Sequence, residues 1–325
     1  MKLNKSHFKK IVNKFKNKKI LVIGDLMIDE YVWGKVSRIS PEAPIPVVDV
    51  EKEEFKPGGA ANVILNLTSL GAKVYSAGVV GDDAGAHKLL NYLKKNKVNI
   101  ASIIIDKKRP TTIKTRVIAH SQQVVRIDKE KRIPVSTEII NKVINRIEKI
   151  IKEVDAVIFS DYGKGVITEK LVDFVVQNAN TKIINVDPKP KNIRIFKNVT
   201  LISPNKKEAQ DATGIHIENE KDIDRAAEEL KKITNSKVIL LTRGEEGMTL
   251  FYENEKHHIP AVAREVYDVT GAGDTVISVM TLALTTGASF KDSAYLANIA
   301  AGKVVAEIGV AVLTPEELKG AVDEM

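Results

Sequence analysis

The chain has 325 residues, of which 43% are hydrophobic and 28% are charged, so it can bury a large core and remain soluble. It contains no cysteine, which excludes disulfides and cysteine-based zinc sites. The formal net charge is +8, but Lys is spread along the chain beside Glu and Asp and is not gathered in a stripe with aromatic residues. We therefore expect no nucleic-acid partner and attribute the charge to solvated surface and to attraction for anionic small molecules.

The first 19 residues carry apolar side chains at the spacing of a one-sided helix, from Phe8 to Phe15. They lack the apolar segment of a secretory signal. Elsewhere the longest nearly apolar stretch, Val276 to Leu284, is too short to span a bilayer. We expect a helix that packs against the domain, no membrane partner and a cytoplasmic location.

A short apolar run, Ile20 to Gly24, predicts a buried strand that delivers Asp25 and Asp29 to its carboxyl end. Ligands bind at the carboxyl ends of strands in open α/β sheets, so both carboxylates are candidates for binding sugar hydroxyls. Roles in turns or helix caps are the alternative for both residues.

Two stretches, at about 31–50 and 111–128, predict the strands of a small β-sheet that projects from the main body as a lid. Prolines at positions 41, 44 and 46 exclude a helix in the first stretch. The second stretch carries Lys114, Arg116 and Arg126, which are available to meet a phosphate, although a solvated strand face would explain each of them alone.

A pair of glycines, Gly58 and Gly59, comes just before a predicted helix that ends at Gly71. Glycines at such a position let a ligand approach the backbone closely. Asn62 follows them and offers both a hydrogen-bond donor and an acceptor to a sugar diol.

From residue 137 onward, predicted helices and strands alternate, which indicates βαβ units and a parallel sheet. Four of these strands end in polar residues, and the carboxyl ends of parallel strands share one edge of a sheet. The predicted strands are 156–160, 182–186, 199–202 and 237–241, followed by Asp161, Asp187, Asn205 and Thr242. We expect one active-site rim along this edge.

The stretch Asp268 to Asp274 combines small residues with a carboxylate just before an apolar segment. Gly271, Ala272 and Gly273 let the backbone turn so that N–H groups and the positive end of the next helix meet at one anion site. A carboxylate there is unfavourable unless it does chemistry, and Asp274 could take a proton from a hydroxyl that attacks phosphorus. A helix cap followed by a glycine turn is the alternative. The chain contains no P-loop motif and no complete dinucleotide-binding motif.

Four motifs together resemble those of the ribokinase (PfkB) carbohydrate kinases, and the similarity covers nearly the whole chain. They are Gly58 to Asn62, Asn205 to Glu208, Thr242 to Gly247 and Asp268 to Asp274. The resemblance implies a ribokinase-like α/β fold, in which a mostly parallel central sheet is flanked by helices and carries a small β-sheet lid. It also implies a single kinase domain over residues 1–325.

Three further segments resemble the heptose 7-phosphate kinases of ADP-heptose synthesis: Ser37 to Pro44, Ser160 to Gly165, and Glu265 to Tyr267. The implied reaction is ATP-dependent phosphorylation of D-glycero-β-D-manno-heptose 7-phosphate at the anomeric hydroxyl. In the usual bifunctional version a nucleotidyl-transfer domain follows the kinase. Because this chain ends near Met325, we expect that activity, and a phosphatase, to reside in separate proteins.

The resemblance also implies the roles of individual residues. Asp274 would be the base, Gly271, Ala272 and Gly273 the anion hole, and Asn205 with Glu208 would hold Mg²⁺ through water. ATP would contact Asn205, Glu208, Thr242, Gly244, Gly247 and Asn298. The sugar would contact Asp29, Gly58, Gly59 and Asn62, and its phosphate Lys164, Lys189, Arg116 and Arg126. A homodimer through the small sheet is expected, because Ile45, Val47 and Val50 would otherwise lie on exposed edge strands.

Two alternatives stay open. The protein could phosphorylate another sugar or sugar phosphate, such as fructose 1-phosphate, with the same fold. It could also be a non-catalytic sugar-binding regulator, against which the intact Asp274, Asn205 and Glu208 argue.

Overall fold

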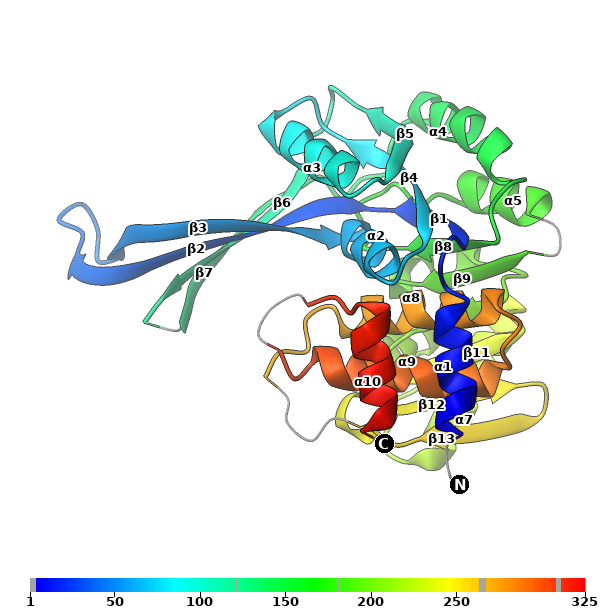
Figure 1. Cartoon of the computed structure of the whole chain (residues 1–325). Helices are drawn as coiled ribbons and strands as arrows, with labels where there is room; N and C mark the ends of the chain where they lie inside the picture. Colours follow the sequence, from blue (N-terminus) through cyan, green and yellow to red (C-terminus); the bar gives the residue numbers. More distant parts are fainter. Residues whose placement is uncertain (1–3, 121, 180–181, 263–266, 308–310, 325) are drawn as a thin grey trace.

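A large, mostly parallel β-sheet runs through the body of the protein in the computed structural model (Figure 1). The structure describes residues 4–120, 122–179, 182–262, 267–307 and 311–324. Within them the sheet has nine strands: β1 (Lys19–Gly24), β4 (Lys73–Val80), β5 (Asn99–Ile105), β8 (Ala156–Ser160), β9 (Ile183–Asp187), β10 (Leu201–Ile202), β11 (Val238–Thr242), β12 (Met248–Tyr252) and β13 (Glu255–Ile259). Their order is β13-β12-β11-β10-β9-β8-β1-β4-β5. Only β12 and β13 pair antiparallel with their neighbours.

Both faces of this sheet are covered, as its nearly continuous apolar strands require. Along β1, Ile20 and Val22 belong to one buried cluster, whereas Leu21 and Ile23 belong to the other. This alternation follows from the two-residue period of a strand, because successive side chains point to opposite faces. Strand β1 lies between β8 and β4, and its two faces contact the two cores on opposite sides of the sheet.

The helices divide between the two cores. The first core packs against α1 (Lys5–Asn13), α2 (Ala60–Ser69), α3 (Ala84–Lys95), α8 (Ala272–Thr285), α9 (Phe290–Val304) and α10 (Pro315–Asp323). The second packs against α4 (Thr137–Ile150), α5 (Glu169–Asn178), α6 (Lys206–Thr213) and α7 (Glu220–Thr234). Two short 3₁₀ turns, η1 (Pro190–Ile195) and η2 (Gly244–Glu246), follow β9 and β11. Within the described residues, no helix combines the length and apolar character needed to cross a membrane.

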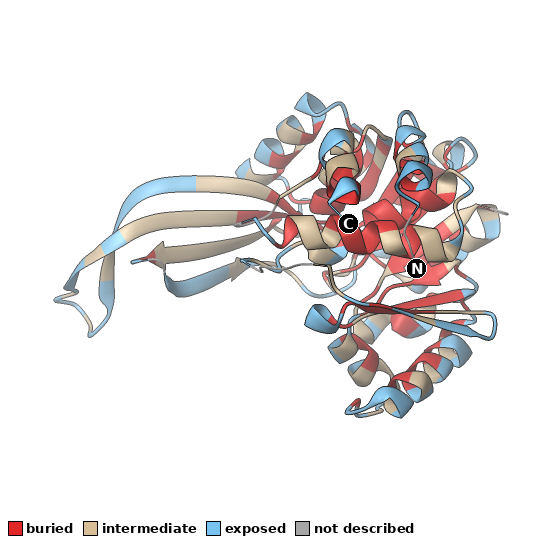
Figure 2. Ribbon diagram, turned by 60° about the horizontal axis from the view of Figure 1, so that its bottom comes forward, coloured by how far each residue is buried: buried red, intermediate tan, exposed pale blue. Residues whose placement is uncertain are grey.

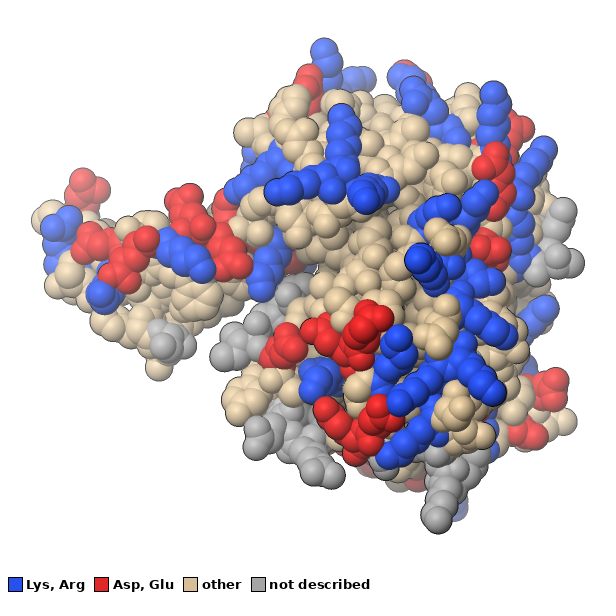
Figure 3. All heavy atoms as spheres, in the orientation of Figure 1, with Lys and Arg blue, Asp and Glu red and all other residues tan. Residues whose placement is uncertain are grey.

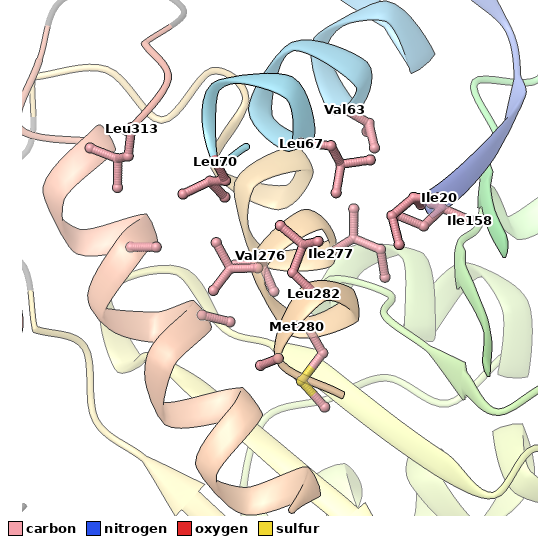
Figure 4. Close-up of a cluster of buried hydrophobic side chains, with 14 of the residues drawn as sticks. Ile20, Val63, Leu67, Leu70, Ile158, Val276, Ile277, Met280, Leu282 and Leu313 are labelled. Atoms are coloured by element: carbon pink, nitrogen blue, oxygen red, sulfur yellow. The ribbon is translucent and has the colours of Figure 1, made fainter. Parts of the chain in front are cut away.

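Helix α8 is buried around its whole circumference from Asp274 to Leu284. Its side chains are mostly apolar, the hydroxyls of Ser278 and Thr281 donate to carbonyls within the helix, and the helix packs against α2, α9 and β9. Figure 4 shows its residues Ile277 and Met280 in the same cluster as Leu67 of α2. The core therefore fixes the position of the helix start, where Asp274 lies.

A second sheet of four strands projects from the body and is far less buried than the rest (Figures 1 and 2). Its strands are β2 (Leu26–Ile39), β3 (Pro46–Gly59), β6 (Thr112–Ala119) and β7 (Gln122–Lys129), in the order β3-β2-β6-β7. The expected fold class, with a parallel central sheet and a second small sheet, is confirmed. The strands β2 and β3 are longer than expected, and β5 and the β12–β13 hairpin were not anticipated from the sequence.

Replacing Ile277 by Ala should destabilise the fold by about 2–5 kcal/mol, because the side chain is fully buried and the rigid core cannot close the cavity. Equilibrium urea unfolding measures this change. The matched control is Ile133→Ala, whose side chain is 57% exposed and whose loss should cost less than about 0.5 kcal/mol. Equal effects of the two substitutions would contradict the placement of α8 in the core.

Candidate active site

A cavity of about 300 Å³ opens at the carboxyl ends of the central strands. It is lined by Tyr162, Asp187, Lys189, Ser203, Asn205, Glu208, Thr242, Val269, Gly271, Gly273 and Asp274. Four of the lining residues, Tyr162, Asp187, Asn205 and Thr242, lie at or just beyond the ends of β8 to β11. The structure thus brings the glycine loop to the rim that the sequence predicted at the strand ends.

Asp274 lies in the first turn of α8 and is almost completely buried, with 5% of its surface exposed. One carboxylate oxygen accepts a hydrogen bond of 2.6 Å from Nδ2 of Asn62, and the other accepts one of 2.8 Å from the hydroxyl of Tyr162. Burial raises the pKa of Asp274 to about 6, while these two hydrogen bonds act to lower it. The carboxyl group is therefore mostly ionised at neutral pH and is basic enough to accept a proton.

The start of α8 has the geometry of an anion site. Gly271 caps the helix with a left-handed φ of 83°, a conformation that strongly favours glycine. Gly273 is exposed, and a Cβ atom there would meet nothing within 4 Å. Gly271 and Gly273 line the cavity, so the first turn of α8 and the positive end of its dipole face it, which is compatible with an anion hole at Gly271, Ala272 and Gly273.

Asn205 and Glu208 form a capping box at the start of α6. The Asn205 side chain accepts from the Glu208 N–H at 2.8 Å, and Glu208 accepts from the Asn205 N–H at 3.0 Å. The other Glu208 oxygen pairs with the Lys189 ammonium. Burial and the carboxylates of Asp274 and Glu208 raise the pKa of Asp187, which lines the same cavity, well above its usual value.

The donor set fits a magnesium ion held through water. Within the described residues no group of three or more His, Asp or Glu is arranged to hold a metal directly. Asn205 and Glu208 both line the cavity and keep oxygen atoms that a hydrated cation could approach. A cation that keeps its water and bridges phosphates needs few protein ligands, so the expected role of these two residues is compatible with the structure.

Thr242 ends β11 and forms a parallel bridge to Asn205, which places the two residues side by side. The turn that follows contains Gly244 and Gly247, both with positive φ. A Cβ atom at Gly247 would lie 2.1 Å from the Ile259 carbonyl oxygen, so the turn requires glycine there. Only Thr242 of these three lines the cavity, and the glycines shape the turn beside it.

The expected sugar-binding residues lie where the small sheet joins the body. Asp29 is buried and accepts a 2.6 Å hydrogen bond from Nη1 of Arg116, as part of an ion pair. A Cβ atom at Gly58 would lie 2.0 Å from an Asp29 oxygen, so the absence of a side chain makes room for that carboxylate. Gly59 has φ of 55°, and Asn62 in the first turn of α2 reaches Asp274.

Asp25, the other carboxylate at this end of β1, has a structural role. It is buried and accepts hydrogen bonds from the N–H groups of Tyr162, Lys164 and Val166, between 2.9 and 3.2 Å. Asp25 therefore holds the loop after β8 in place, which is the turn role that the sequence left open. That loop carries Tyr162 to the cavity.

The basic residues expected near a sugar phosphate are each paired with a carboxylate. The pairs are Arg116 with Asp29, Arg126 with Asp128, Lys164 with Glu130, and Lys189 with Glu208. Lys114 differs, because its ammonium makes no hydrogen bond or ion pair with a described residue and lies 5.9 Å from the centre of the Tyr162 ring. Burial and the nearby Lys164 lower the pKa of Lys114.

Two further expectations concern Asn298 and the segment Glu265 to Tyr267. Asn298 is buried in α9, where Nδ2 donates a 2.7 Å hydrogen bond to the Pro260 carbonyl, and its place beside an adenine stays a prediction. Glu265 and Val266 fall outside the described residues. Sequence reasoning assigned no role to the cavity residue Tyr162, although its place just beyond a strand end was a usable signal.

Comparison with known proteins places this geometry in a family. Residues 17–317 match the sequence model of the pfkB family carbohydrate kinases. The chain is 46% identical over 316 residues to the bifunctional protein HldE of Desulfatibacillum aliphaticivorans, covering 96% of this chain and 65% of that protein. It is 45% identical over 305 residues to the bifunctional protein HldE of Helicobacter hepaticus, covering 93% and 63%. The chain thus spans about two thirds of the length of these curated relatives.

Solved structures show the same fold at low sequence identity. Ribokinase from Arabidopsis thaliana, complexed with ribose and ATP, superposes with a TM-score of 0.74 at 19% identity, over 94% of this chain and 99% of that one. Phosphofructokinase-2 from Escherichia coli, in complex with substrates and products, gives a TM-score of 0.76 at 17% identity, over 95% and 99%. With a family match over most of its length, the chain belongs to the pfkB family of carbohydrate kinases, enzymes that transfer a phosphoryl group from ATP to a sugar.

Proposed function

We propose that the protein phosphorylates D-glycero-β-D-manno-heptose 7-phosphate at its anomeric hydroxyl and forms the 1,7-bisphosphate. The observation that carries this proposal is the 43–46% identity to several relatives named bifunctional protein HldE, over nearly the whole chain. The similarity of Ser160 to Gly165 to heptose 7-phosphate kinases supports it, because this segment lies at the cavity. Such a bisphosphate needs a phosphatase and a nucleotidyltransferase to become a nucleotide sugar.

In the proposed mechanism Asp274 acts as the general base. Its carboxylate takes the proton of the anomeric hydroxyl while the sugar oxygen forms a bond to the γ-phosphorus of ATP. The bond between that phosphorus and the bridging oxygen breaks, and ADP leaves. The N–H groups at the start of α8 stabilise the charge on the transferred phosphoryl group.

The remaining cavity residues bind the nucleotide phosphates in this proposal. Asn205 and Glu208 would hold Mg²⁺ through water, and Mg²⁺ would neutralise charge on the phosphates. Lys189 adds a positive charge on the same side of the cavity, next to Glu208. Thr242, with the turn at Gly244 and Gly247, would border the phosphates.

One observation favours a second candidate, a kinase that takes an unphosphorylated sugar. The four cations expected at the 7-phosphate are already paired with carboxylates, so none of them offers a free charge. The substrate phosphate would need either to displace a carboxylate or to bind a different cation. The two candidates differ in whether a second phosphate on the sugar improves binding.

The first prediction is that heptose 7-phosphate gives a bisphosphate with a new phosphorus signal coupled to the anomeric proton. Asp274 and the start of α8 fix the line of transfer, so the end of the sugar opposite its phosphate reacts. Phosphorus NMR of the product, with unphosphorylated heptose and fructose 1-phosphate as parallel substrates, checks this. Coupling to any other carbon-bound proton, or faster turnover of an unphosphorylated sugar, would contradict the proposed substrate.

Lys114 is the cation best placed to bind the substrate phosphate. It lies on β6 directly opposite Asp29 of β2, so both side chains share the face of the small sheet that also carries Arg116. Its ammonium is unpaired within the described chain and approaches the ring of Tyr162, whose hydroxyl reaches Asp274. Lys114 is therefore next to the expected sugar contact Asp29 and near the ring of the tyrosine that contacts the base.

Replacing Lys114 by Ala should raise KM for heptose 7-phosphate about tenfold or more, because a charged hydrogen bond to phosphate is lost. KM for ATP and for an unphosphorylated sugar should change little. The matched control is Lys129→Ala, since Lys129 lies on the opposite face of the sheet beside Asp83. Steady-state kinetics of both variants measures these KM values. An unchanged KM for the phosphorylated sugar in Lys114→Ala would show that Lys114 does not bind the substrate phosphate.

We also propose a homodimer formed through the small sheet. One face of this sheet carries Asp29 and Arg116, whereas the other face carries Val32, Val117 and Val125 in register. Val125 is 47% exposed, and its neighbour on the same face, Ile127, is 56% exposed. On a sheet that projects into solvent, such a face is stabilised when a second copy covers it.

The substitution Val125→Glu should convert the dimer to a monomer, because it places a charge in the proposed apolar contact. Light scattering at micromolar concentration measures the mass of both proteins. Ile133→Glu, which changes an apolar residue that is 57% exposed and lies outside the sheet, should leave the dimer intact. A wild-type monomer, or dissociation by both variants, would count against this interface.

A further inference from the structure

We propose that Tyr162 is a positioning residue for the base and that its hydroxyl keeps the Asp274 carboxylate ionised and correctly oriented for proton transfer. This inference rests on the proposed role of Asp274. It adds a residue that neither the motifs of the glycine loop nor the strand-end pattern assigned. It concerns the chemical step and applies whichever sugar the enzyme uses.

The geometry of Tyr162 fits this role. Tyr162 lies in the loop that follows β8. Asp25 holds this loop, because its carboxylate accepts hydrogen bonds from the backbone N–H groups of Tyr162 and Lys164. The Tyr162 hydroxyl donates a 2.8 Å hydrogen bond to Oδ1 of Asp274, and its side chain lines the cavity. The loop therefore fixes the phenol at the carboxylate.

The two hydrogen bonds to Asp274 come from different elements and reach different oxygens. Asn62 of α2 holds Oδ2, and Tyr162 holds Oδ1, so the plane of the carboxylate is set from both sides. Each carboxylate oxygen can accept more than one hydrogen bond, so a substrate hydroxyl can still bind. Tyr162 thus orients the base without blocking it.

Tyr162 stays protonated and therefore donates to Asp274, whose ionised carboxylate can only accept. Burial and the carboxylates of Asp274 and Asp187 raise the pKa of Tyr162 well above its usual value, so the phenol stays neutral at working pH. Lys114 and Lys189 approach its ring, at 5.9 and 5.4 Å from the ring centre. These contacts involve the ring and would survive removal of the hydroxyl.

Other charged groups around Asp274 also change its pKa, and the Tyr162 hydroxyl acts against those that raise it. Asp29 of β2 raises the pKa of Asp274, and Lys189 after β9 lowers it. Asp187 at the end of β9 interacts with Asp274 as a like charge. A donor that stabilises the charged carboxylate lowers its pKa, and loss of that donor must raise it.

The experiment measures kcat/KM against pH for Tyr162→Phe, using the sugar that the wild-type enzyme phosphorylates fastest. Wild-type activity should fall on the acid side as Asp274 is protonated. We call this fall in kcat/KM at low pH the acid limb. In Tyr162→Phe the acid limb should move to higher pH by about one unit, because Asp274 loses a donor that stabilises its charged form. At pH values above the acid limb, kcat/KM should stay within about tenfold of wild type. The control Tyr92→Phe, which removes a hydroxyl on α3 where the ring packs against Phe55, should leave the profile unchanged.

Incorporation of 3-fluorotyrosine at position 162 provides a second variant that keeps the hydroxyl and the ring. Its more acidic phenol donates a stronger hydrogen bond, so the acid limb should move to lower pH. An acid limb in Tyr162→Phe that coincides with wild type, or an equal loss of activity at every pH, would overturn the inference and leave Tyr162 a structural residue.

The role of Asp274 is tested separately by Asp274→Asn, which should abolish turnover and leave ATP binding largely intact. A near-normal kcat in this variant would show that the base is wrongly assigned. A normal acid limb in Tyr162→Phe together with an inactive Asp274→Asn would refute only the role of Tyr162. The two failures are therefore distinguishable.

Discussion

The rest of the site depends on an ionisable carboxyl group that is buried at the start of a buried helix. Burial alone disfavours the ionised form of Asp274, which is why its pKa rises to about 6. The charge is tolerated because the positive end of α8 and two hydrogen bonds offset the lost water. These partners come from α2 and from the loop after β8, so three separate elements must be placed together for one carboxylate to function.

The same cavity is crowded with negative charge. Asp187 and Glu208 both line the cavity, and the Lys189 ammonium pairs with Glu208. Burial, together with the nearby carboxylates of Asp274 and Glu208, raises the pKa of Asp187 well above its usual value. A phosphate group that enters this cavity meets negative charge and binds best together with a cation. This is a physical reason for a phosphate donor that carries a divalent metal.

The sequence predicted the framework of the site well, because that framework follows from local rules. Alternation of helices and strands indicates a parallel sheet, and a parallel sheet gathers its strand ends at one edge. Asp187, Asn205 and Thr242 lie on that rim for this reason. A helix start after small residues likewise located Asp274.

What the sequence could not predict is which side chains pair across the fold. Tyr162 reaches Asp274 only because Asp25, far away in sequence, holds its loop. The partners of the basic residues could not be predicted for the same reason. Lys164, for example, forms an ion pair with Glu130, which lies in a different segment of the chain. Such pairings depend on tertiary distances, and residue type and spacing carry no information about them.

The two-residue period of its strands gives the small sheet one charged face and one apolar face. Along β2, Asp29 and Tyr31 point to the face that carries Lys114 and Arg116, and Val32 points to the opposite face. Figure 3 shows acidic and basic side chains next to one another along this projecting sheet. A register shift of one residue would exchange the two faces and move the charged groups away from the cavity. The pairing that places Asp29 beside Lys114 is thus the same pairing that gathers Val32, Val117 and Val125 on the opposite face.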